Sequence, residues 1–75
     1  MTDSNNTRDV YDFIRDYLEE HQGYAPSIRN IADGLYLGRS TVVRHLDKLE
    51  AWGVIQRAPN LPRSIRLTDR SWPSD

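Results

Sequence analysis

Residues 38–57 read GRSTVVRHLDKLEAWGVIQR, and this stretch decides the fold that we expect for the whole chain. At helical spacing the apolar residues on one face are Val42, Leu46 and Leu49, and the polar residues on another face are Thr41, Arg44, His45 and Lys48. Gly53 then ends the helix, because glycine enters the left-handed conformation without steric cost. The β-branched residues Val54 and Ile55 follow and favour an extended segment. The stretch therefore predicts a helix with a packing face and an outward face, followed by a strand.

Two further helices are predicted upstream of this stretch. The first has an amphipathic pattern from Val10 to Leu18, and Thr7 is its expected N-cap. Residues 1–6 carry little apolar surface and are expected to form a flexible tail. Gly23 ends the first helix, and Ser27 caps a short second helix that continues to Leu35. Residues 36–38 then form the turn of a helix-turn-helix, whose second helix is able to enter the major groove of DNA.

A small β-hairpin is predicted downstream. Residues 54–57 and 64–67 alternate between apolar and polar types, and residues 58–63 connect them with two prolines that do not join a regular ladder. Residues 69–75 read as a second flexible tail. The expected fold class is mainly α with a small β-hairpin, a three-helix winged helix-turn-helix. It forms a single domain over residues 1–75, with an ordered core of about 8–67.

The composition limits what such a chain does. Seventy-five residues without cysteine leave no room for a second domain, a disulfide framework or a thiolate zinc site. No signal peptide or apolar membrane span is visible, so we expect a soluble, cytoplasmic protein. The formal net charge is −1, but residues 1–25 carry six acids against two arginines, and residues 39–66 carry six cations against two acids. This uneven distribution is able to present a positive face to phosphates, although, taken alone, it is better explained by solvated helix faces.

Catalytic and metal chemistry are not indicated. The acids of the first helix lie mainly on its polar face, without an apolar pocket or a cation to separate their pKa values. His21 and His45 have no neighbouring ligands in the pattern, and no glycine-rich phosphate loop or nucleophile with a base is present. We therefore expect no enzyme activity, no cofactor and no metal.

Several segments resemble the N-terminal DNA-binding domain of LexA-type repressors. They are residues 10–16 (VYDFIRD), 25–27 (APS), 31–32 (IA), 45–49 (HLDKL), 53–55 (GVI) and 63–67 (RSIRL), so the likeness covers most of residues 8–67. The middle of the chain is equally similar to other bacterial winged helices. The resemblance does not extend to the C-terminal self-cleaving domain that family members use for dimerisation, so the sequence is either a fragment or a free-standing relative.

The resemblance implies a set of DNA-contacting residues. Those placed toward the bases are Ser40, Thr41, Val43 and Arg44. Apart from the resemblance, cation chemistry and position favour a second set on the DNA backbone or in the wing, although solvated surface explains each cation singly almost as well. This set is Ser27, Arg39, Lys48, Arg57, Asn60, Arg63 and Arg66. LexA-like recognition helices often carry two adjacent acids where this chain has Val43 and Arg44. Arginine bonds guanine and valine contacts a thymine methyl, whereas a carboxylate accepts from cytosine, so we expect a different operator.

The expected function is sequence-specific binding of double-stranded DNA by a repressor-like transcriptional regulator, and a homodimer on an inverted repeat is one arrangement open to it. A winged helix that serves as a protein-interaction or assembly module is the alternative. Near-neutral net charge and the aromatic residues Tyr24, Tyr36 and Trp72 favour that alternative.

Overall fold

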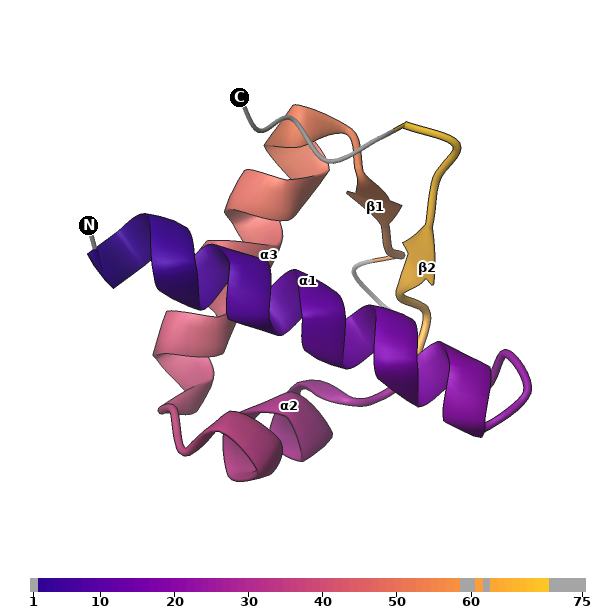
Figure 1. The fold of residues 1–75 in the computed structure, drawn as a ribbon, viewed down its shortest axis with the longest axis horizontal. Helices are drawn as coiled ribbons and strands as arrows, with labels where there is room; N and C mark the ends of the chain where they lie inside the picture. The colour runs from indigo at the N-terminus through magenta and orange to yellow at the C-terminus, as the bar shows by residue number, and fades with distance from the viewer. Residues whose placement is uncertain (1, 59–60, 62, 71–75) are drawn as a thin grey trace.

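The computed structural model describes residues 2–58, 61 and 63–70, with side chains from residue 7 onward. Its elements in chain order are α1 (Thr2–Glu20), α2 (Ile28–Leu35), α3 (Arg39–Trp52), β1 (Ile55–Gln56) and β2 (Arg66–Leu67). In Figure 1, α1 lies across the view, with α3 on the left, the hairpin on the right and α2 below. Three helices and an antiparallel hairpin confirm the predicted fold class of a mainly helical winged helix-turn-helix.

Helix α1 begins earlier than the sequence predicts. It starts at Thr2, so residues 2–6 belong to the helix. The prediction that Thr7 is its N-cap is therefore wrong. The hydroxyl of Thr7 is not used at a helix end, because it lies in the interior, 2.7 Å from Nδ1 of His45 on α3. Of the predicted C-terminal tail, residues 71–75 lie outside the described residues.

The helix-turn-helix is defined by local capping, as predicted. Ser27 Oγ accepts from the Asn30 backbone N–H at 3.0 Å, and Asn30 Oδ1 accepts from the Ser27 N–H at 3.0 Å, which completes a capping box. Tyr36 ends α2 in the left-handed conformation, with φ 57°, and Gly38 begins α3 with an extended backbone. Gly53 ends α3 with φ 79°, where only glycine is free of strain.

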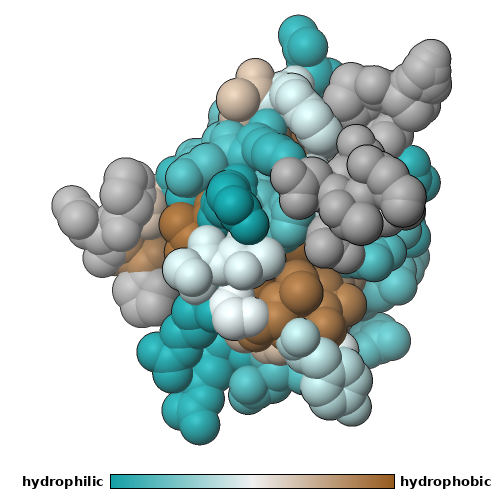
Figure 2. All heavy atoms as spheres, turned by 90° about the vertical axis from the view of Figure 1, so that its left-hand side faces the viewer, coloured by the Kyte–Doolittle hydropathy of each residue, from teal (hydrophilic) through white to brown (hydrophobic). Residues whose placement is uncertain are grey.

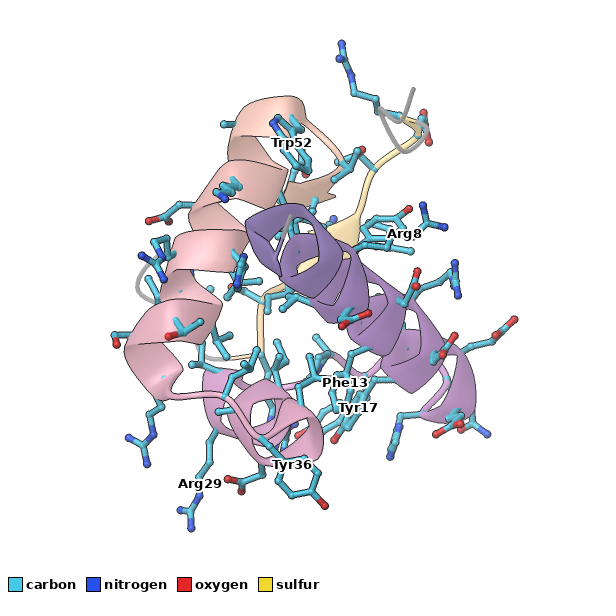
Figure 3. The ribbon with its side chains drawn as sticks, turned by 60° about the vertical axis from the view of Figure 1, so that its left-hand side comes forward. Arg8, Phe13, Tyr17, Arg29, Tyr36 and Trp52 are labelled. Carbon is cyan, nitrogen blue, oxygen red and sulfur yellow. The ribbon has the colours of Figure 1, made fainter. Side chains whose placement is uncertain are left out.

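The core lies between the three helices and the hairpin. The fully or almost fully buried apolar residues are Val10, Ile14, Ala25, Ile31, Ala32, Val42, Leu46, Leu49, Val54, Ile55 and Ile65. The predicted core residues of α3 are therefore confirmed, and Leu67 and Trp52 pack against this cluster at its edge. Phe13 and Tyr17 lie between α1 and α2 (Figure 3), where a Cβ on Gly34 would collide with the Phe13 ring. The absence of a side chain at Gly34 thus lets α1 and α2 approach closely.

The hairpin is shorter than predicted. Its antiparallel ladder pairs Ile55 with Leu67 and Gln56 with Arg66, and does not include the rest of residues 54–57 and 64–67. A side chain replaces the ladder beyond it, since Ser64 Oγ accepts from the Ala58 N–H at 2.9 Å and donates to the Ala58 carbonyl at 3.0 Å. The wing, which we define as residues 55–67, is therefore closed by a side chain rather than by longer strands.

Candidate nucleic-acid interface

The four residues expected to read bases all lie on the N-terminal half of α3. Ser40 and Arg44 are exposed, and Thr41 and Val43 are half-buried. Figure 2 looks onto the side of the molecule that lies on the left in Figure 1, where α3 runs, and shows a surface on which hydrophilic areas are interrupted by hydrophobic ones. The structure thus leaves polar side chains of α3 available to a ligand while the opposite face of the helix packs into the core.

His45 is the exception to the predicted outward face. It is fully buried, and its Nδ1 lies 2.7 Å from Thr7 Oγ1, so the assignment of this residue to the outward face is wrong. The reason is its spacing, because His45 lies three residues after Val42 and four before Leu49, which are both buried. This spacing is the signal in the sequence that indicates burial of His45, whereas the polarity of histidine favours an exposed position.

A groove of about 650 Å³ separates the N-terminal half of α3 from the wing. Its lining includes Ser27 and Ile28 at the start of α2, Arg39 and Val43 on α3, and Leu61 of the wing. Helix α3 and the wing therefore project on the two sides of one concave surface, with the N-terminus of α2 between them.

Arg57 faces α3 rather than open solvent. Its Nη2 lies 2.6 Å from Asp47 Oδ1 and its Nε lies 3.0 Å from Glu50 Oε1, and its side chain is only 18% exposed. Asp47 and Glu50 are the two acids of residues 39–66. Arg57 thus joins the end of β1 to α3, and its single positive charge offsets one of the two negative charges of this segment.

Among the other predicted backbone-contacting residues, Ser27, Arg39 and Arg63 line this groove. Arg39 and Arg66 are exposed, Lys48 is half-buried, and the hydroxyl of Ser27 is engaged in the cap of α2. Arg63 Nη1 donates to the Ala25 carbonyl at 3.0 Å. Asn60 lies outside the described residues. The structure therefore brings together α3, the start of α2 and the wing, but it engages Arg57 and Arg63 in contacts within the protein.

Acidic residues are concentrated on the far side, on α1. There Arg8 pairs with Asp12 at 3.2 Å, and Arg15 pairs with Asp12 at 3.3 Å. Within the described part of the chain, no group of three or more histidines and acids is arranged to hold a metal ion. None of the described helices is long and apolar enough to cross a membrane.

A helix-turn-helix with an exposed polar recognition helix and an adjacent wing defines the class of winged helix-turn-helix domains. The model of the LexA DNA-binding domain family matches residues 3–64, which include all three helices and much of the wing. The chain belongs to the family of LexA DNA-binding domains.

Similar proteins include three that bear the name LexA repressor. The chain is 42% identical over 72 residues to that of Clostridium tetani, 40% over 73 residues to that of Carboxydothermus hydrogenoformans, and 40% over 68 residues to that of Listeria welshimeri. These matches cover 95%, 96% and 89% of this chain. The chain spans only 36%, 35% and 33% of the lengths of these relatives.

Proposed function

We propose that the chain binds double-stranded DNA in a sequence-specific manner and acts as a cytoplasmic, repressor-like transcriptional regulator. In this proposal α3 enters the major groove and the wing lies on the backbone or in the minor groove. The observation that carries it is the polar N-terminal half of α3, which is exposed beside a wing in a member of the LexA DNA-binding domain family.

The base-reading roles rest on hydrogen-bonding chemistry. The exposed guanidinium of Arg44 is able to form a bidentate bond to guanine, and Val43 offers an apolar contact to a thymine methyl. Ser40 and Thr41 supply hydroxyls that donate or accept. All four project from one half of a single helix, as a reader of a few consecutive base pairs requires.

Contacts to phosphate are assigned to cations around this helix. Arg39 and Arg66 are exposed on α3 and β2, and Lys48 lies one turn beyond Arg44. Ser27 stands at the N-terminus of α2 within the same groove, and Asn60 belongs to the wing loop. Such contacts fix register and orientation but carry no sequence information.

We further propose that two copies bind an inverted repeat. A single recognition helix reads only a short half-site, and two copies related by a two-fold axis double that length. Selection of bound sequences from a random duplex pool tests this directly. Two half-sites about 10 base pairs apart centre to centre support a dimer, and a single half-site contradicts it.

A salt titration separates DNA binding from a protein-interaction role. Because binding releases condensed counterions, the logarithm of the association constant should fall linearly with the logarithm of the salt concentration, with a slope of about −0.9 for each phosphate contacted. No duplex binding at low salt, together with self-association or capture of a protein partner, would contradict the proposal and favour an assembly module. Tyr36, which is 94% exposed, is then the first residue to test in that module.

A further inference from the structure

Arg63 joins two segments that lie far apart in the sequence. Its Nη1 donates to the carbonyl of Ala25 at 3.0 Å, and its guanidinium carbon lies 5.1 Å from the centre of the Tyr24 ring. Tyr24 and Ala25 belong to the segment between α1 and α2, while Arg63 follows the wing loop. A guanidinium is suited to both contacts at once, because its planar face stacks on an aromatic ring while its edge donates hydrogen bonds.

The backbone conformation of Arg63 also indicates that these contacts hold the residue in place. Its φ is 57°, in the left-handed region that is disfavoured for a residue with a side chain. Such a conformation persists when the surrounding contacts determine it. Ala25 is 5% exposed and directly precedes Pro26 and the Ser27 cap, so the acceptor belongs to a well-fixed part of the body.

A second arginine holds the other end of the same loop. Arg57 precedes the loop and pairs with Asp47 and Glu50 on α3, as described above. Arg63 follows the loop and contacts the segment between α1 and α2. The chain before the wing loop is thus fastened to α3, and the chain after it is fastened to the segment between α1 and α2.

We propose that Tyr24 and Arg63 form a clasp that sets the position of the wing, and that Arg63 is a positioning residue rather than a phosphate contact. This proposal rests on the DNA-binding function proposed above. The clasp orders the wing before DNA arrives, so the cost of ordering it is not deducted from the binding free energy. Tyr24, which has no charge and lies outside the helix-turn-helix, thereby contributes to DNA affinity.

The test measures duplex affinity and its salt dependence for Arg63→Ala, Arg63→Lys and Tyr24→Ala, with a duplex selected by the wild-type chain. All three substitutions should weaken binding by about three- to tenfold, since lysine keeps the charge but loses the planar geometry. The salt slope should stay at the wild-type value, and the double variant Tyr24→Ala with Arg63→Ala should bind no more weakly than Arg63→Ala alone. The matched control is Arg39→Ala, in which loss of an exposed cation should reduce the salt slope by about 1.

The opposite pattern would overturn the clasp. If Arg63→Lys and Tyr24→Ala bind like the wild type while Arg63→Ala reduces the salt slope by about 1, Arg63 contacts phosphate. Hydrogen exchange at the Ala58 amide, which bonds Ser64 Oγ, reports the clasp without DNA. Faster exchange in Arg63→Ala supports the clasp, and unchanged exchange contradicts it. If the wild-type chain binds no duplex, the proposed function fails, and the exchange experiment still decides whether the clasp holds the wing.

Discussion

The helical body of this molecule and its wing are held by different kinds of contact. In the body, apolar residues of α1, α2 and α3 are fully buried against one another, and a buried hydrogen bond joins Thr7 to His45. In the wing, Ile55 and Ile65 reach the same core, but the ladder has only two strands of 2 residues each. The chain on both sides of the loop is held by polar contacts of Arg57 and Arg63. Burial is insensitive to salt, whereas partly exposed charge contacts are screened by it.

This difference suits the proposed roles of the two regions. A recognition helix must present its side chains in a fixed geometry, and α3 is held along one face by Val42, Leu46 and Leu49. A wing that follows the DNA backbone tolerates small shifts, because phosphate contacts carry no base information. The comparison predicts that substitutions in the body change global stability, while those in the wing act locally.

The largest effect should come from Leu46→Ala. Leu46 is fully buried at the centre of α3, so the truncation should lower the free energy of unfolding by about 2–5 kcal/mol through lost burial and a cavity. Urea denaturation followed by circular dichroism measures this change. The matched control is Leu61→Ala in the wing, where a leucine that is 63% exposed should lose less than about 0.5 kcal/mol. Equal losses of unfolding free energy for Leu46→Ala and Leu61→Ala would contradict the difference between body and wing.

Thr7→Val should have the next largest effect. Valine has nearly the same shape, but it removes the hydroxyl that lies 2.7 Å from the buried Nδ1 of His45. Leaving that nitrogen without this partner should cost about 1–3 kcal/mol in the free energy of unfolding. Ser40→Ala, which removes an exposed hydroxyl on α3, serves as the control and should be close to neutral. A neutral Thr7→Val would show that the bond does not stabilise the body.

Arg57→Ala should act mainly on the wing. Its two ion pairs are partly exposed at Asp47 and Glu50, so the global free energy of unfolding should fall by about 1 kcal/mol or less. Hydrogen exchange should nevertheless accelerate at the Thr68 amide, which bonds the Val54 carbonyl beside the ladder. In the wild type, high salt should also accelerate hydrogen exchange at the Thr68 amide. A loss as large as that of Leu46→Ala would contradict the separation between body and wing.

Tyr36→Gly should have the smallest effect, and it should be stabilising. Tyr36 has φ 57° and is 94% exposed, so glycine relieves the left-handed strain with little loss of packing. Greater freedom of the unfolded chain opposes this gain, which leaves about 0.5 kcal/mol. Thermal denaturation measures the change, with Gly53→Ala as the comparison. Gly53 also has a positive φ, and a Cβ there would lie 3.2 Å from the Arg70 side chain, so this substitution should be destabilising. A destabilised Tyr36→Gly would contradict this prediction and show that the greater freedom of the unfolded chain outweighs the relief of strain.

Local chemistry allowed much of the fold to be predicted. Ser27, Gly38 and Gly53 define helix ends by capping or by a left-handed backbone, and each depends only on neighbours within a few residues. The Thr7–His45 bond could not be predicted in this way, because it joins residues 38 positions apart. The predicted start of α1 is wrong for this reason, because a threonine before an apolar run is typical of an N-cap and its distant partner His45 is not visible in the sequence.

The residues of the candidate site also differ in how far the sequence predicts them. The resemblance to LexA-type repressors predicts that Ser40, Thr41, Val43 and Arg44 face the bases, and all four lie on the N-terminal half of α3. Their contacts with bases stay a prediction. The environments of Arg57 and Arg63 depend on side chains brought close by the fold. The sequence shows only that these residues are cations near a wing, so it could not distinguish phosphate contacts from anchors within the protein.

The most direct test of base reading by α3 compares Arg44→Ala with the wild type on a selected duplex and on a random duplex of equal length. The account predicts that the variant loses about 1–3 kcal/mol of binding free energy on the selected duplex and relaxes the preference at one base pair, with a smaller loss on random DNA. An equal loss on both duplexes would contradict it, because Arg44 would then contribute charge without reading a base.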